Sequence, residues 1–214
     1  MSGAREEVLA RVRSALRDAP PGEDVRVTRE YSRGFDGNAV ELFAERVADY
    51  EASVHRVTPG DLARTITGIC GGRGLAIPPD LPREWRPDGV KLVEDTPISN
   101  QDLDSLDGAL TGCALAIAET GTIVLDSGPG QGRRALTLIP DWHVCVVEED
   151  RVVGSVPQAI ERLERAVREG RPITFISGPS ATSDIELERV AGVHGPRTLE
   201  VLLVAALSDR RGVP

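Results

Sequence analysis

A polar segment rich in glycine and hydroxyl side chains, residues 177–186, is the part of the sequence best suited to bind an anion. It follows the apolar run 173–176, which is typical of a buried strand, and the spacing after it predicts a short helix beginning near Ser180. Free backbone N–H groups and the positive end of a helix dipole at such a strand–helix junction favour an anionic ligand. The same residue types also act as ordinary helix caps, so a purely structural role is the alternative. The predicted ligand-binding residues here are Gly178, Pro179, Ser180, Thr182 and Asp184.

Glu119 is the carboxylate best placed for acid–base or nucleophilic chemistry. It follows the apolar run 114–118, so we expect it to be partly buried, and burial makes a carboxylate more basic. A basic glutamate of this kind suits a general base or a nucleophile. The alternative is a structural glutamate that accepts hydrogen bonds from the backbone of a tight turn. Thr120, Gly121 and Thr122 are predicted to bind ligand beside it.

His194 is the second predicted catalytic residue, because imidazole titrates near neutral pH and the neighbouring Gly195 permits close approach of a ligand. In parallel α/β folds, ligands bind beyond the carboxyl ends of the strands, where Glu119 and Ser180 are expected. His194 instead precedes the apolar run 198–204 and belongs by this rule to the opposite edge. The sequence therefore does not establish that these residues share one site.

Two other polar features are interpreted as structural. The loop 128–134 combines three glycines with Arg133 and Arg134, and such a loop could close over a phosphate or carboxylate. A mobile loop is the commoner outcome, and no Gly-Lys-Ser/Thr of a phosphate-binding Walker loop follows. His143 lies near the start of the expected strand 142–147, so we assign it a structural role.

Four sequence blocks together resemble the LUD-domain family in order and spacing. They are residues 118–122 (AETGT), 139–144 (IPDWHV), 178–186 (GPSATSDIE) and 192–196 (GVHGP). The resemblance extends over residues from about 40 to 207. It implies an α/β fold with a mainly parallel sheet flanked by helices, like that of the sugar-phosphate isomerases and CoA transferases. It also implies a component of a system that oxidises L-lactate to pyruvate together with iron–sulfur partner proteins.

Three functions stay open at this point. The first is that lactate-oxidising component, with a small anionic ligand bound at the strand–helix junction. The second is a stand-alone enzyme acting on sugar-phosphate or CoA-linked substrates through Glu119, as the CoA transferases use a glutamate; their glycine-rich oxyanion loop is not evident here. The third is a non-catalytic adaptor subunit. The identity of any cofactor is not indicated.

The composition limits the partners and the cellular compartment. The net charge of −9 argues against nucleic acid or an anionic membrane as a partner. No apolar run is long enough to cross a bilayer and the N-terminus lacks a secretion signal, so we expect a cytoplasmic protein. The three cysteines form no Cys-x-x-Cys and the three histidines are not at ligand spacing, so we expect neither a metal site nor an iron–sulfur cluster in this chain.

The expected elements place these residues in three parts: an N-terminal helix and linker over 1–39, an α/β domain over 40–207 and a tail over 208–214. Apolar residues at helical spacing predict helices over 5–17, 40–54, from Pro59 to Gly71, from Ser99 to Leu106 and over 156–169, the last with Val156, Ile160, Leu163 and Val167 on its buried face. Apolar runs predict strands over 75–77, 90–93, 114–118, 122–125, 142–147, 152–153, 173–176 and 198–204. The alternation predicts a mainly parallel sheet that ends in a βαβ unit over 173–204.

Overall fold

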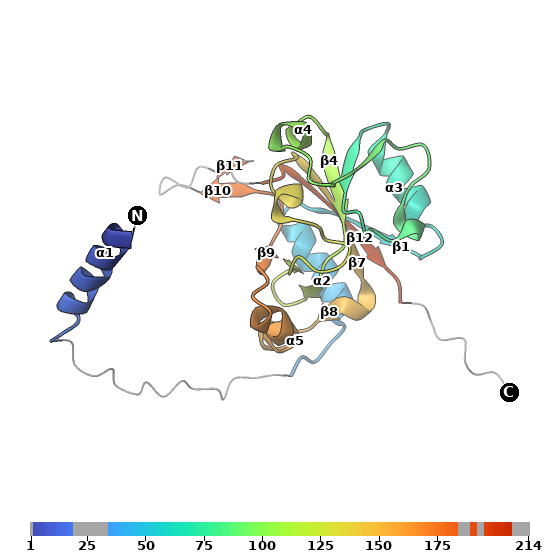
Figure 1. The fold of residues 1–214 in the computed structure, drawn as a ribbon. Helices are drawn as coiled ribbons and strands as arrows, with labels where there is room; N and C mark the ends of the chain where they lie inside the picture. The colour runs from blue at the N-terminus through green and yellow to red at the C-terminus, as the bar shows by residue number, and fades with distance from the viewer. Residues whose placement is uncertain (1, 19–33, 184–188, 192–194, 207–214) are drawn as a thin grey trace. The chain divides into compact units, whose positions relative to one another are not determined.

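The computed structural model describes residues 2–18, 34–183, 189–191 and 195–206, and the chain divides into two units, Met1–Ser32 and Arg33–Pro214. In the first unit, α1 (Ser2–Ala15) confirms the predicted N-terminal helix (Figure 1). Its apolar side chains Val8 and Val12 are exposed, as is Leu16 just beyond its end.

The second unit contains a parallel sheet of six described strands in the order β1-β12-β7-β4-β2-β3 (Figure 1). Every neighbouring pair in it is parallel, which confirms the predicted α/β class with a mainly parallel sheet. The strand β4 was not among the predicted strands, because its sequence is short and begins with glycine. The strands are β1 (Ser53–Val57), β2 (Leu75–Ile77), β3 (Leu92–Glu94), β4 (Gly108–Thr111), β7 (Trp142–Glu148) and β12 (Thr198–Val204).

A second sheet has the order β8-β5-β6-β9 within the described residues. β6 runs antiparallel to both β5 and β9, so the turn 118–121 closes a β5–β6 hairpin. Gly121 in this turn has a φ of 57°, and a Cβ there would lie 2.6 Å from the carbonyl carbon of Arg46. Only glycine fits so close to that backbone. The strands are β5 (Leu115–Ile117), β6 (Thr122–Leu125), β8 (Val152–Val153) and β9 (Thr174–Ile176).

Helices cover the faces of both sheets. α3 packs on one face of the six-stranded sheet, and α2 packs on the other face and on the second sheet. α5 covers the remaining face of the second sheet, because alternate residues of β5 and β6 point to opposite sides. The helices are α2 (Ala39–Asp49), α3 (Leu62–Cys70), α4 (Asn100–Asp104) and α5 (Val156–Arg168), with single 3-10 turns η1 (Arg83–Trp85), η2 (Arg134–Thr137) and η3 (Glu149–Arg151).

Three predicted helices differ in detail. α2 ends at Asp49 rather than residue 54, because Glu51 adopts a left-handed φ of 67° that breaks the helix. α3 begins at Leu62, so Pro59 stands in the preceding turn instead of the first helical position. On α5 the buried side chains are Ala159, Leu163 and Ala166, since the alanines let the helix lie close to the sheet. The predicted face was therefore wrong at three positions, which are exposed: Val156, Ile160 and Val167.

The predicted βαβ unit over 173–204 was also wrong. β9 belongs to the second sheet and β12 to the first, so the two strands are not neighbours. No described residue near Ser180 is helical, because β10 (Ala181–Ser183) pairs antiparallel with β11 (Arg189–Ala191). Thr182 stands opposite Val190 in this ladder, and β-branched residues favour strands over helices. An anion site based on a helix dipole at Ser180 is thus not supported by the described residues.

Candidate anion-binding site

A cavity of about 220 Å³ lies where β9 ends and β7 and β12 begin. His143 and Leu199, which stand opposite each other near the start of their strands, form its floor. The cavity is therefore at the amino ends of these parallel strands, whereas the sequence argument expected the carboxyl ends. The difference arises because β9 runs in the second sheet, and its end reaches the amino edge of the first. The other polar residues that line the cavity are Arg134, Thr137, Ser177 and Ser180.

Four predicted ligand-binding residues meet at this cavity: Gly178, Pro179, Ser180 and Gly195. The segments that carry them are joined by a backbone hydrogen bond in which the N–H of Ser180 donates to the carbonyl of Pro196 at 2.7 Å. This contact brings together two blocks that the strand order had seemed to separate. The predicted Asp184 and His194 lie outside the described residues, and the structure describes Thr182 only by its place in β10.

Gly178 has a packing reason to be glycine as well as a place in the cavity wall. Its φ is 93°, a left-handed conformation that favours glycine. A Cβ at this position would lie 2.5 Å from the Cβ of Tyr50, the residue that caps the C-terminus of α2. The wall of the cavity therefore rests directly on the end of this helix.

The predicted residues of the β5–β6 turn have different places. Thr122 joins the cavity wall through hydroxyl contacts, since its Oγ1 is 2.7 Å from the Oγ of Ser177 and 2.7 Å from the Oγ1 of Thr120. Glu119 is exposed at the hairpin turn, so its expected burial was wrong. The neighbouring turn residues Ala118 and Gly121 are buried, whereas the Glu119 side chain is directed to the surface. Glu119 does not line the cavity.

His143 is the most deeply buried polar residue of the site, with 1% of its surface exposed. Its Nε2 lies 2.8 Å from the Oγ1 of Thr111, and the Thr111 hydroxyl itself donates to the carbonyl of Gly112 at 2.9 Å. Burial, together with the positive charge of Arg134, lowers the pKa of His143 to about 4. The imidazole is therefore neutral at physiological pH.

Arg134 supplies the positive charge of the cavity. Its Nη1 donates to the carbonyl of Thr137 at 2.8 Å and to the Oγ1 of the same residue at 2.9 Å. Among the described residues no carboxylate forms an ion pair with it. Burial lowers the pKa of the guanidinium from its ordinary value, yet a guanidinium stays charged in proteins. A partly buried cation without a described counter-ion favours an anionic ligand.

The loop that presents Arg134 is held by its neighbours. Arg133 makes a two-pronged ion pair with the buried Asp95, at 2.7 and 2.9 Å, and donates to the carbonyl of Ile98 at 2.6 Å. The N–H of Gly130 donates to the carboxylate of Asp80 at 3.0 Å. The loop is thus an anchored segment, and of its two arginines one is structural and the other lines the cavity.

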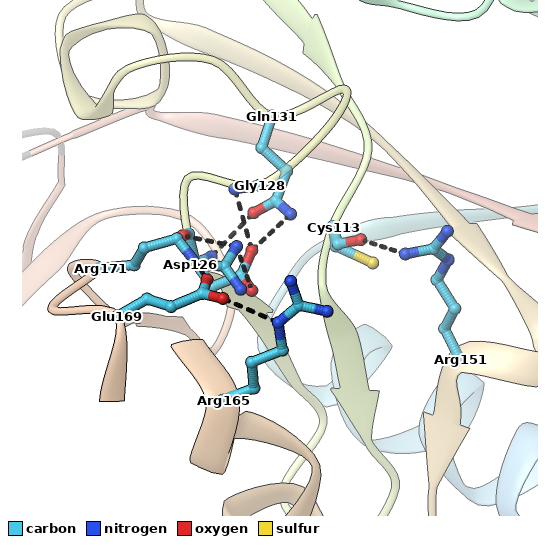
Figure 2. Close-up of polar contacts among 8 residues, drawn as sticks. All are labelled: Cys113, Asp126, Gly128, Gln131, Arg151, Arg165, Glu169 and Arg171. Atoms are coloured by element: carbon cyan, nitrogen blue, oxygen red, sulfur yellow. Dashed lines mark hydrogen bonds and ion pairs between the residues drawn. The ribbon is translucent and has the colours of Figure 1, made fainter. Parts of the chain in front are cut away.

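A polar cluster centred on Asp126 (Figure 2) joins the two segments of the chain that lead to Arg134 and to Ser177. Its Oδ1 accepts from the N–H of Gly128 at 3.0 Å and from the Nε2 of Gln131 at 2.7 Å. Its other oxygen pairs with Arg171 at 2.9 Å. Asp126 begins the loop that leads to Arg134, and Arg171 begins the segment that leads through β9 to Ser177, so one ion pair ties both segments together.

Sequence reasoning missed the two residues that dominate the site, Arg134 and His143. Both stood in segments that had been singled out, but composition favoured a mobile loop for Arg134, and the position of His143 near the start of a strand favoured a structural role. The described residues contain no group of three histidine, cysteine or acidic side chains that could hold a metal ion. No helix in the described part of the chain is long and apolar enough to cross a membrane.

Comparison with known proteins identifies related sequences. A family model described as the LUD domain matches residues 84–204. A Deinococcus radiodurans protein named Lactate utilization protein C is 49% identical over 164 residues, which are 76% of this chain and 77% of the relative. A Geobacillus kaustophilus protein of the same name is 30% identical over 73% of this chain and 72% of its own length.

A solved structure shares the fold as well as the sequence. The crystal structure of a DUF162 family protein from Deinococcus radiodurans matches with a TM-score of 0.70 and 43% sequence identity. The match covers 78% of this chain and 96% of that protein. The architecture described above is therefore that of an experimentally determined relative.

Proposed function

Because this chain belongs to the LUD-domain family, we propose that it serves lactate utilisation by binding a small carboxylate, L-lactate or its oxidation product pyruvate, at Arg134. The observation that carries this proposal is the Arg134 guanidinium in the cavity, with Thr137 as its hydrogen-bond partner and no described carboxylate to neutralise it. A guanidinium matches the planar geometry of a carboxylate.

The size of the cavity supports a small ligand. Pockets for drug-sized ligands have volumes of about 300–1,000 Å³, and this one has about 220 Å³. A three-carbon acid fits within such a space, which is too small to enclose an intact CoA or a dinucleotide. The hydroxyls of Ser177 and Ser180 and the backbone near Gly178 and Gly195 give the ligand further polar neighbours.

We also propose the setting that the family resemblance implies: a cytoplasmic system that oxidises L-lactate to pyruvate with iron–sulfur partner proteins. In that setting the electrons leave through the partner chains, and this chain positions the acid. The names of the relatives support lactate utilisation as the process. The catalytic roles of Glu119 and His194 stay predictions, as does the alternative of a non-catalytic subunit.

Calorimetric titration of the full chain with L-lactate and with pyruvate tests this function. We expect Arg134→Gln to weaken binding of both acids by about 10- to 100-fold, because hydrogen bonds to a charged group contribute about 1.5–3 kcal/mol. The matched control is Arg168→Gln, which removes an exposed arginine of α5 and should leave binding unchanged. Unchanged affinity in Arg134→Gln, or no binding of either acid to the unmodified chain, would contradict the proposal.

Growth on L-lactate gives the test in the cell. In a strain that lacks this protein, the unmodified chain and Arg168→Gln should restore growth, and Arg134→Gln should not, although it accumulates as folded protein. Full growth with Arg134→Gln would show that the cavity is not needed for lactate utilisation.

A further inference from the structure

We propose that this cavity selects 2-hydroxy acids over 2-oxo acids, and that Thr111, which does not itself line the cavity, is the residue that determines this specificity. The inference rests on the proposed function, because it concerns the acid that Arg134 holds. It depends on the hydrogen-bond network behind the cavity rather than on the cavity wall itself.

The Thr111 hydroxyl has a single proton. We assign this proton to the carbonyl of Gly112, which can only accept and lies 2.9 Å away, so at the 2.8 Å contact with His143 the threonine oxygen accepts. The donor in this contact is therefore the Nε2–H of His143. Thr111 is fully buried, which keeps water from offering an alternative partner.

This assignment leaves Nδ1 of His143 as an unprotonated acceptor. A neutral imidazole carries one proton, and the network places it on Nε2. The low pKa of His143, about 4, keeps the ring from gaining a second proton at neutral pH. No described residue forms a hydrogen bond with Nδ1, so it is the ring nitrogen left for a ligand at the cavity that His143 lines.

The cavity thus offers a cation and, near it, a hydrogen-bond acceptor. A 2-hydroxy acid matches both, because its carboxylate accepts from Arg134 and its hydroxyl donates to Nδ1. A 2-oxo acid matches only the first, since its keto oxygen is an acceptor and would face another acceptor. A site whose polar group is left unpaired by the wrong substrate discriminates more strongly than an apolar wall does.

The test is the ratio of affinities for L-lactate, pyruvate and propionate, measured on the full chain by calorimetry. All three share the carboxylate, and only lactate carries the hydroxyl. We expect lactate to bind about three- to tenfold more tightly than pyruvate, the worth of one net hydrogen bond. In Thr111→Val the fixed acceptor is gone and either tautomer is allowed, so the ratio should fall toward one while affinity for propionate persists. Thr111→Ser restores the hydroxyl and should restore the ratio.

Nuclear magnetic resonance of ¹⁵N-labelled histidine in the unmodified chain provides a second readout that needs no variant. We expect a Nε2–H tautomer for His143 that persists at neutral pH. Equal affinity of the unmodified chain for lactate and pyruvate, or a Nδ1–H tautomer, would overturn this inference and leave the carboxylate site intact. Failure of all three acids to bind would instead overturn the proposed function on which it rests.

Discussion

The two polar residues that dominate the cavity differ in their charge at neutral pH. Arg134 is a cation that remains charged, and His143 is a titratable group that burial and Arg134 keep neutral. Sequence could identify the residue types but not these states, because burial comes from strand pairing far along the chain. The same limit affected Glu119, whose apolar neighbours predicted burial while the hairpin turn exposes it.

The neutral state of His143 makes stability depend on pH. Its pKa is lowered from 6.5 to about 4 in the folded chain, so between these values the unfolded chain binds more protons. Stability is therefore full above pH 6.5 and decreases as the pH falls toward 4. Between pH 7 and pH 5 we expect a loss of about 2 kcal/mol from this residue.

Urea unfolding at the two pH values measures this loss. His143→Gln cannot titrate, so the unmodified chain should lose about 2 kcal/mol more than the variant on acidification. His55 and His194 are present in both proteins, and their contributions cancel in the comparison. Equal losses would show that His143 is already protonated or not buried.

At the scale of elements, strand pairings between segments distant in the sequence bring the cavity walls together. The hydrophobic pattern along the sequence does not indicate which strands pair. Strand existence was predicted for most runs because apolar runs mark them well. The sheet to which each strand belongs was not predicted, because the sequences of β9 and β12 are both typical of buried strands although the two strands belong to different sheets. The hairpin of β10 and β11 replaced a predicted helix because serine and threonine suit both a cap and a strand.

The Asp126–Arg171 pair (Figure 2) joins the segments that lead to these walls, so its loss should weaken ligand binding from outside the cavity. Asp126→Asn keeps the shape and removes the charge, and it leaves the partly buried Arg171 with Glu169 as its remaining carboxylate partner. We expect a loss of about 1–3 kcal/mol in the free energy of unfolding and a several-fold rise in the Kd for L-lactate. Denaturant unfolding and calorimetry measure the two effects.

The matched control is Glu148→Gln, which breaks the more exposed ion pair with Arg151. That change should alter stability by less than about 1 kcal/mol and leave lactate affinity unchanged. If Asp126→Asn lowered stability but not affinity, the pair would hold the fold without setting the position of Arg134.

At the scale of the whole molecule, every described residue of the site belongs to the second unit, Arg33–Pro214. The predicted division of the chain placed an N-terminal helix and linker before the α/β domain, and the exact borders stay a prediction. Among the described residues of the first unit, the apolar side chains Val8 and Val12 of α1 are exposed.

Deletion of residues 1–32 should therefore leave the second unit folded and able to bind L-lactate. The deletion retains Phe35, whose ring packs against Gly154. We expect the melting temperature to change by no more than about 2–4 °C, the shift that 1 kcal/mol produces in a domain of this size. A large drop in melting temperature or a loss of binding would show that the first unit is part of the functional body.

The most direct test of the central claim is a crystal structure of the full chain with L-lactate. We predict the lactate carboxylate in the 220 Å³ cavity with its oxygens about 2.7–3.2 Å from the guanidinium nitrogens of Arg134, and its hydroxyl at the same range from Nδ1 of His143. Lactate bound elsewhere on the chain, or an empty cavity in crystals grown at a saturating lactate concentration, would contradict the account.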